Sequence, residues 1–267
     1  MIASLPMYAL PDVMAQTEAW WQGLARAFRS EGIAEVPDSL DLGTSRFEHW
    51  ASPDLLLSQS CGYPLRHDFA GFLRPVATPC YRAEGCAGPS YVSVIAVRED
   101  DPAGAMPEFF GRRAAINGWD SHSGMSALRS LAAPYHRGGH FFSEVAVTGS
   151  HWASMAAVRE GKTDIAAIDC VTYALTSRHA PGRVVGLRIL TTSAAVPALP
   201  YVTSLTRDDE TVRRLRAGIA KAIADPSLGS VRDDLLIADF AVLDSDDYAP
   251  IDVMEREATA RGYPRID

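Results

Sequence analysis

The sequence predicts an α/β fold, because short apolar segments of strand length alternate with segments of helical periodicity along most of the chain. No internal repeat, low-complexity tract or Pro/Ser-rich linker interrupts this alternation. Such a pattern predicts mostly parallel sheets with helices on both faces. Ligands of these sheets bind beyond the carboxyl ends of the strands. Four small-polar loops lie between a predicted strand and a predicted helix, and they are where we expect the site: SQSCGYP, NGWDSHSG, TGSHW and IDCVTY.

The individual elements follow from the apolar spacing. The predicted strands cover 2–8, 55–60, 73–78, 91–97, 113–116, 145–148, 164–168 and 187–191. The turn at 61–64 leads into a helix through Phe69, and another helix covers 171–177. Thr206 is expected to cap a late helix. The remaining helices are recognised from apolar residues on one face: Trp20, Trp21, Leu24 and Phe28; Met125, Leu128 and Leu131; Trp152, Met155 and Val158; and Val212, Leu215, Ile219 and Ile223.

Length and composition limit the class of protein. A chain of 267 residues with 47% apolar and 22% charged residues is ordinary for a soluble globular protein with one large domain or two modest ones. The formal charge of −8 and the lack of a Lys/Arg cluster argue against a nucleic-acid binder. No run of 18 apolar residues predicts a membrane span. The first residues, MIASLPMYALPD, lack the pattern of a signal peptide, so either the protein stays in the cytoplasm or a leader has been removed.

Cysteine and histidine spacing gives little support for a metal site. Cys80 and Cys86 enclose the short loop CYRAEGC, so they either form a small disulfide in an exported protein or remain free thiols in a reducing compartment. The chain has no CxxC pair, and we therefore expect no structural zinc site. His136 and His140 have the spacing of two ligands on a helix, but the proline and glycines around them predict a solvated loop.

The loop sequence SHSG at 121–124 is the sharpest binding signal. It follows the strand at 113–116 and opens a helix, so serine hydroxyls and the N–H groups of a helix N-terminus gather at one point. That arrangement suits the oxygens of a phosphate, phosphonate or carboxylate. The alternative is that Ser121 or Ser123 only caps the helix. No Gly-Lys-Ser/Thr follows, which excludes a Walker A loop, and neither serine has the flanking glycines of a nucleophile elbow.

The loop SQSCGYP offers the same chemistry in the first part of the chain. Ser60, Gly62 and the Tyr63 hydroxyl can donate hydrogen bonds to a ligand. Cys61 stands at the start of the following helix, where a thiol can have a lowered pKa and act as a nucleophile. The alternative is a buried and inert cysteine.

His151 and Asp169 stand at the two remaining loops. His151 starts a helix after Thr148-Gly149-Ser150, so it either donates to an anion or caps its own helix. Asp169 ends a strand, where it can accept from an amine of the ligand or orient His151 or a hydroxyl. A Ser121–His151–Asp169 catalytic triad can be drawn, but no spacing in the sequence supports it.

The order of these motifs resembles the phosphate/phosphite/phosphonate substrate-binding proteins of ABC transporters. VTGSHWASMAAVREGKTDIAAIDCVTYAL is similar to that family's strand ending in G-S/G-H, its helix, and its G-x-x-D…I-D pattern. INGWDSHSGMSAL is similar to its strand and S-x-S-G helix start. LLLSQSCGYPL and SYVSVIAVRED resemble its first-lobe strand and the strand on which the chain passes between lobes. The resemblance extends from Ile2 to about Ala224.

The resemblance implies a two-lobed type 2 periplasmic-binding-protein fold. Lobe one would comprise 1–98 and 192–267, lobe two 99–191, and the ligand would bind in a cleft that closes by a hinge. His122 in the serine triplet and the CGYP turn depart from the family pattern, and both bear on which ligand fits. The ligand-binding residues carried over by motif are Ser121, His122 (backbone) and Ser123, then Ser60, Gly62 and Tyr63, then His151 and Asp169, with Tyr8 and Tyr91 as further candidates.

The function predicted from these observations is a non-catalytic solute-binding protein for a small oxyanion of the phosphonate or phosphate type. It requires no cofactor, and its partners would be the anionic ligand and an ABC permease, with the protein itself a monomer. The location would be the periplasm if a leader is removed and the cytoplasm otherwise. Two alternatives stay open: a cytoplasmic enzyme on the same fold that acts on a small carboxylate with Cys61, His151 or Asp169 as acid or base, and a cytoplasmic ligand sensor.

Overall fold

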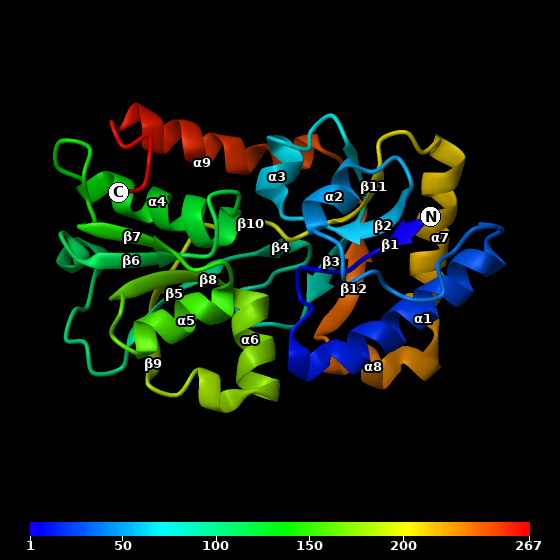
Figure 1. The fold of residues 1–267 in the computed structure, drawn as a ribbon, viewed down its shortest axis with the longest axis horizontal. Helices are drawn as coiled ribbons and strands as arrows, with labels where there is room; N and C mark the ends of the chain where they lie inside the picture. Colours follow the sequence, from blue (N-terminus) through cyan, green and yellow to red (C-terminus); the bar gives the residue numbers. More distant parts are fainter. The chain divides into compact units, whose positions relative to one another are not determined.

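The computed structural model describes all 267 residues, which form two compact units (Figure 1). Both units are discontinuous in sequence. Unit 1 comprises Met1–Arg82, Ala87–Pro89 and Pro197–Tyr248, and unit 2 comprises Ala83–Cys86, Ser90–Val196 and Ala249–Asp267. Each unit has its own five-stranded sheet and its own apolar core. The α/β class predicted from the alternating pattern is therefore confirmed.

The sheet of unit 1 has the strand order β1-β2-β11-β3-β12. Strand β2 has five consecutive buried residues, which is the pattern of a central strand covered on both faces. Helix α1 packs against α7 and α8, whereas α2 packs against β2 and β11. The elements of unit 1 are β1 (Ile2–Ala3), α1 (Met14–Ser30), α2 (Arg46–Ala51), β2 (Leu55–Gln59), α3 (Gly62–Arg66), β3 (Leu73–Tyr81), β11 (Tyr201–Ser204), α7 (Asp209–Ala224), α8 (Gly229–Asp234) and β12 (Ile237–Ala241).

Helices α1 and α7 pack closely because Gly218 of α7 has no side-chain carbon. A Cβ added to Gly218 of α7 would lie 2.5 Å from Cδ1 of Phe28 in α1. Phe28 is fully buried and also meets Trp21 of the same helix, with ring centroids 6.2 Å apart. The predicted apolar face of α1 is confirmed, since Trp20, Trp21, Leu24 and Phe28 are all buried.

The sheet of unit 2 has the strand order β7-β6-β8-β5-β9. Figure 1 shows α4 and α9 on one side of this sheet and α5 and α6 on the other. Strands β4 (Ser90–Tyr91) and β10 (Val196–Pro197) pair in a separate short ladder. The other elements of unit 2 are β5 (Ser93–Arg98), β6 (Arg113–Ile116), a π-helical turn (His122–Ser126), α4 (Ala127–Ala132), β7 (Glu144–Val147), α5 (His151–Arg159), β8 (Ile165–Asp169), α6 (Cys170–His179), β9 (Leu187–Thr192) and α9 (Ala249–Ala260).

The pairing in both sheets is mixed, whereas the alternating pattern predicted mostly parallel sheets. Strand β6 is parallel to β7 and β8, and β1 is parallel to β2. Strands β5, β9, β11 and β12 make antiparallel pairs instead. The alternation identified βα units correctly, but strands that enter a sheet from a distant part of the chain carry no sequence signal for their direction.

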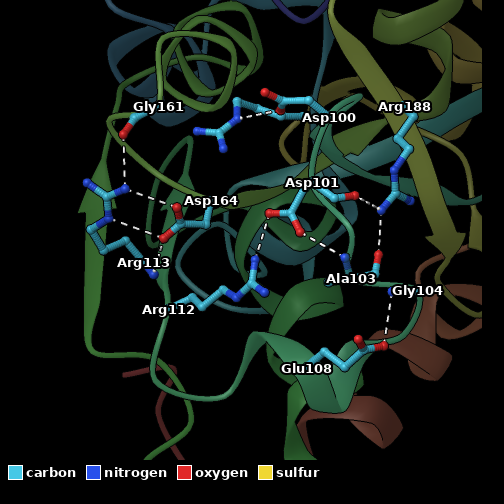
Figure 2. A network of polar contacts seen from close by, with 11 residues as sticks. Asp100, Asp101, Ala103, Gly104, Glu108, Arg112, Arg113, Gly161, Asp164 and Arg188 are labelled. Atoms are coloured by element: carbon cyan, nitrogen blue, oxygen red, sulfur yellow. Dashed lines mark hydrogen bonds and ion pairs between the residues drawn. The ribbon is translucent and has the colours of Figure 1, made fainter.

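A polar network fixes the end of the unit 2 sheet at which β6 and β8 begin (Figure 2). Arg113 donates to Oδ2 of Asp164 from Nε at 3.1 Å and to Oδ1 from Nη2 at 3.0 Å. Arg112 donates to Oδ2 of Asp101 at 2.6 Å, and Arg188 donates to the carbonyls of Asp101 and Ala103. Burial would raise the pKa of Asp164, but its contacts with Arg113 outweigh that effect and lower the pKa. This bidentate pair holds the starts of β6 and β8 in register.

Three local predictions differ from the structure. The strand expected over 2–8 is only Ile2–Ala3, because Pro6 has no N–H to contribute to a ladder. The helix after CGYP ends at Arg66 rather than Phe69, since the backbone at His67 leaves the helical region. Helix α7 is capped by Asp208, whose carboxylate accepts from Thr211 N at 2.8 Å, and not by Thr206, which lies in the preceding turn.

The unit boundaries also differ from the predicted lobes of 1–98 with 192–267 and of 99–191. Residues 90–98 contribute β5 to the unit 2 sheet, where Ser93 pairs with Asp169 of β8. Residues 249–267 belong to unit 2 as well, because α9 packs on α4. Buried Arg129 of α4 donates to the Pro264 carbonyl at 2.8 Å, which holds this C-terminal segment in place.

Candidate functional site

The predicted oxyanion loop starts where β6 ends. Its helix does not begin as a regular α-helix, because His122–Ser126 form a π-helical turn in which Ser126 N donates to the Ser121 carbonyl at 3.1 Å. Such turns are rare and occur frequently at functional sites. The Ser121 hydroxyl oxygen accepts from Gly124 N at 3.0 Å, so the capping role considered for Ser121 is present. The cap uses only the hydroxyl oxygen, and the proton can be donated, with Ser123 Oγ 3.5 Å away as one acceptor.

Gly124 allows the loop to fold back on β6. A Cβ at this position would lie 1.8 Å from Oδ1 of Asn117, the first residue after β6. Asn117 Oδ1 is itself shielded from solvent and has no hydrogen-bond partner. The sequence marked Asn117 only as a turn residue, whereas the structure shows it packed under the start of the π-helical turn.

Ser123 joins this loop to a second one. Its Oγ lies 2.8 Å from Nε2 of His151, the first residue of α5, and 3.5 Å from the Ser121 Oγ. Three polar side chains from two loops therefore lie together: two hydroxyls and one imidazole. The triad drawn from the sequence named Ser121, but the serine that meets His151 is Ser123.

His151 is placed by the residues before it. Ser150 caps α5, accepting from Ala153 N at 3.1 Å, so His151 is not the cap of its own helix. Gly149 has a φ of +87°, a conformation that favours glycine. Thr148 donates from its hydroxyl to the Ile116 carbonyl at 3.1 Å and so fastens the loop after β7 to the end of β6. Thr148, Gly149 and Ser150 of the TGSH motif thus each help to hold His151 at the start of α5.

Both histidines of the site are held neutral. Burial lowers the pKa of His151 to about 4, against an opposing backbone contact with Ala167. His151 is half-buried as a residue, but its Nδ1 is fully shielded from solvent. Burial and the charge of Arg129 lower the pKa of His122 to about 4 as well. A carboxylate paired with the imidazole, as in a catalytic triad, would have raised the pKa of His151 instead.

Tyr91 and Asp169 complete the neighbourhood in unit 2. Tyr91 is buried and meets His122 edge-on, with ring centroids 6.4 Å apart. Asp169 ends β8 and caps α6, since its Oδ1 accepts from Val171 N at 2.8 Å and from Thr172 N at 3.0 Å. The structure therefore shows a capping role for Asp169, which the sequence analysis had not considered.

Of the predicted residues of unit 1, Ser60 directly follows β2, and Gly62 and Tyr63 begin α3. Ser60 and Gly62 are buried, and the Ser60 hydroxyl donates to the Cys61 carbonyl at 3.1 Å. Tyr63 is half-buried and its ring lies against that of His67, with centroids 4.1 Å apart. Cys61 is buried at the start of α3, the environment expected of an inert cysteine.

Tyr8 lies elsewhere in unit 1. It follows β1, is buried, and meets Tyr81 edge-on with ring centroids 5.3 Å apart. Gln59 at the end of β2 donates to the Tyr81 hydroxyl at 3.1 Å. Tyr8, Tyr81 and Gln59 therefore form a cluster that was not predicted from the sequence. A glutamine at a strand end next to SCGYP was the only signal for it.

Arg129 also lies near the candidate site, and nothing in the sequence indicated this. It stands on the apolar face of the SHSG helix, is buried, and makes an ion pair with Glu255 of α9 at 3.4 Å. Its charge acts on His122. An arginine within a helix usually indicates a solvated position, and only the docking of α9 explains its burial here.

Comparisons with known proteins identify the family and the fold of this chain. A family profile described as the periplasmic phosphonate substrate-binding protein of ABC transporters matches residues 52–248. Comparison with curated proteins gave no match. Solved structures share the fold, among them the following two. PhnD1 from Prochlorococcus marinus in complex with methylphosphonate has a TM-score of 0.76 and 14% identity, covering 97% of this chain and 98% of that one. A binding protein component of an ABC phosphonate transporter from Pseudomonas aeruginosa has a TM-score of 0.74 and 16% identity, covering 98% and 87%.

The fold is that of two-lobed periplasmic binding proteins, and the family profile gives the class as a solute-binding protein. No helix of the structure is long and apolar enough to cross a bilayer. Because the family profile covers most of the chain, this protein belongs to the phosphonate substrate-binding proteins of ABC transporters, as its motifs predicted. This family consists of ligand-binding components of transporters.

The neutral state of His122 predicts how stability depends on pH. Below about pH 6.5 the unfolded chain binds a proton on this histidine, whereas the folded protein does so only near pH 4. The free energy of unfolding should therefore fall as the pH decreases between these values, and one such group contributes on the order of 3 kcal/mol over the window. Urea unfolding of wild type and His122→Gln at several pH values measures the difference. His179→Gln, in the last turn of α6, is the control and should retain the wild-type slope. Equal slopes in all three proteins would contradict the prediction.

The contact between Gly124 and Asn117 predicts the effect of a single methyl group. Gly124→Ala should lower the free energy of unfolding by about 1–3 kcal/mol, because the new Cβ overlaps Asn117. Gly182→Ala is a matched control, since no atom lies within 4 Å of its added Cβ. Denaturant unfolding of both variants checks the prediction, and coincident unfolding curves would refute it.

Proposed function

We propose that this protein binds a small phosphonate or phosphate-type oxyanion through Ser121, Ser123 and His151, with the backbone at His122. The 2.8 Å contact between Ser123 Oγ and His151 Nε2 supports this most directly, because it brings two strand-end loops to one point. Hydroxyl and imidazole donors at that point suit tetrahedral oxyanions. Family membership supports the class of ligand.

The electrostatics of unit 2 are compatible with an anion despite the overall charge of −8. The first N–H groups of a helix have no intrahelical acceptor and carry the positive end of the helix dipole. Short-range dipoles in a shielded site outweigh distant net charge. A neutral His151 also fits, since it holds the Ser123 hydroxyl in place without the cost of burying a second charge.

Other predicted residues have separate roles in the proposal. Ser60, Gly62 and Tyr63 remain candidate donors from unit 1, and Tyr8 remains a further candidate there. In unit 2, Asp169 caps α6 and remains a candidate acceptor for an amine on an aminoalkylphosphonate. Tyr91 would act through His122, which it contacts.

We further propose that the protein acts in the periplasm as the ligand-delivering partner of an ABC permease. The family description supports this assignment. The enzyme alternative is less well supported. Cys61 is buried, and the lowered pKa of His151 does not match an imidazole activated by a carboxylate.

A ligand screen tests the class of anion. Phosphate, phosphite, alkyl- and aminoalkylphosphonates, sulfate and small carboxylates are added to the full chain, and thermal unfolding is followed. A ligand at about a hundred times its dissociation constant should stabilise the protein by roughly 2.7 kcal/mol. We expect stabilisation by a phosphonate or phosphate compound. A response to carboxylates alone, or to no compound, would favour the enzyme or sensor instead.

A double variant tests the residues. Ser121→Ala with Ser123→Ala should weaken binding of the best ligand from the screen at least about a hundredfold, because two charge-assisted hydrogen bonds are lost. Calorimetric titration measures the change. Ser143→Ala with Ser177→Ala, also in unit 2, is the matched control and should bind as wild type. Since Ser121 caps its helix, Ser123→Ala alone provides a variant with the cap intact. Unchanged affinity in both site variants would rule out Ser121 and Ser123 as hydrogen-bond donors to the ligand.

A further inference from the structure

Two cysteines far apart in sequence meet in unit 2. The sulfur of Cys86 lies 3.5 Å from the sulfur of Cys170, although 84 positions separate the two residues. No cysteine of the chain forms a disulfide in the structure. The sequence considered a Cys80–Cys86 pair, but Cys80 lies on β3 in unit 1, opposite Asp239 of β12.

The backbone around this pair is closely fitted. Cys170 N donates to the Val92 carbonyl at 3.2 Å, and Cys86 N donates to the Ala83 carbonyl at 3.0 Å, closing a turn. Gly85 in this turn has a φ of +91°, and a Cβ there would lie 2.6 Å from Val92 Cγ2 and 3.5 Å from Cys170 Sγ. Only glycine allows the turn to lie this close to α6. The sulfur contact therefore rests on fixed backbone positions.

The two thiols differ in environment. Cys170 is the first residue of α6 and is 1% exposed. The hydrogen bond with Cys86 raises the pKa of its thiol, and burial and the neighbouring Asp169 add to this. Cys86 is half-buried, so an external reagent reaches its sulfur first. This is the arrangement of an attacking thiol with a second thiol behind it.

We propose that Cys86 and Cys170 are a redox pair whose disulfide fastens the Ala83–Cys86 turn to the start of α6. The oxidant is a disulfide, either of a dithiol oxidoreductase or of oxidised glutathione. The Cys86 thiolate attacks one sulfur of the oxidant, forms a mixed disulfide and releases one thiol. Cys170 then attacks Cys86 Sγ while its proton passes to the leaving sulfur, which departs as the second thiol. The protein loses two electrons and two protons, and the oxidant disulfide is reduced to two thiols.

The bridge acts on a defined part of unit 2. It links a turn near β4 to the residue after Asp169, whose carboxylate caps α6. A cross-link between residues so far apart in sequence strongly restricts the unfolded chain, and the oxidised protein should therefore resist denaturant better than the reduced one. The inference concerns the thiols alone and does not depend on the ligand proposed above.

Thiol mapping of the full chain tests the pair. Reduced protein is incubated with oxidised glutathione, denatured, blocked with N-ethylmaleimide and digested for mass spectrometry. We expect blocked Cys61 and Cys80, and a peptide pair joined between Cys86 and Cys170. The Cys80→Ser variant should form the same bridge, and Cys86→Ser should not. A Cys80–Cys86 link, glutathione retained on Cys86 alone, or four blocked thiols would each overturn the proposal.

Denaturant unfolding gives a second readout. Oxidation should move the urea midpoint of wild type and of Cys80→Ser to higher concentration, and reduction by dithiothreitol should reverse the shift. Cys86→Ser should show the same midpoint under both conditions. Cys86 is half-buried, so this substitution avoids the core position of Cys170. An oxidant-dependent shift in Cys86→Ser equal to that of wild type would also overturn the proposal.

Discussion

The candidate site depends on the parallel pairing of β6 with β7 and β8. Parallel neighbours end at the same edge of a sheet. At this edge, Ser121–Ser123 follow β6, His151 follows β7 and Asp169 ends β8. Thr148 strengthens this edge, because both its backbone N–H and its hydroxyl donate to the carbonyl of Ile116, at 2.8 and 3.1 Å. The short distance between Ser123 and His151 is a consequence of this register. A shift of one strand by one residue would separate them.

Both ends of these strands are fixed, by different interactions. At the start of β6 and β8, Arg113 and Asp164 form a bidentate ion pair. At the other end, Gly124 packs on Asn117 without space for a side-chain carbon. Electrostatics sets the register where the strands begin, and close packing sets it where the candidate site begins. The site is therefore preorganised by its scaffold, which limits the reorganisation that a ligand must drive.

The two histidines near the SHSG loop are uncharged, although the protein as a whole is acidic. The net charge is −8, but the imidazoles of His122 and His151 are neutral, and the buried Arg129 helps to keep His122 so. Arg129 contacts Glu255 and the carbonyl of Pro264. The C-terminal segment therefore fixes the position of the one buried arginine on the SHSG helix. Residues outside the span matched by the family profile thus support the loop that the profile covers.

The sequence by itself determined the α/β class, most element positions, the family, and the loops that carry the candidate site. These features are local: apolar periodicity, small-polar loops and short motifs are read from adjacent residues. Only the tertiary structure decided that β5 belongs to the unit 2 sheet, that α9 covers α4, and that Cys86 meets Cys170 rather than Cys80. The same holds for Ser123 as the partner of His151. Strand direction, helix docking and side-chain contacts between distant segments depend on how units of similar local structure pack together, and no single stretch of sequence contains that information.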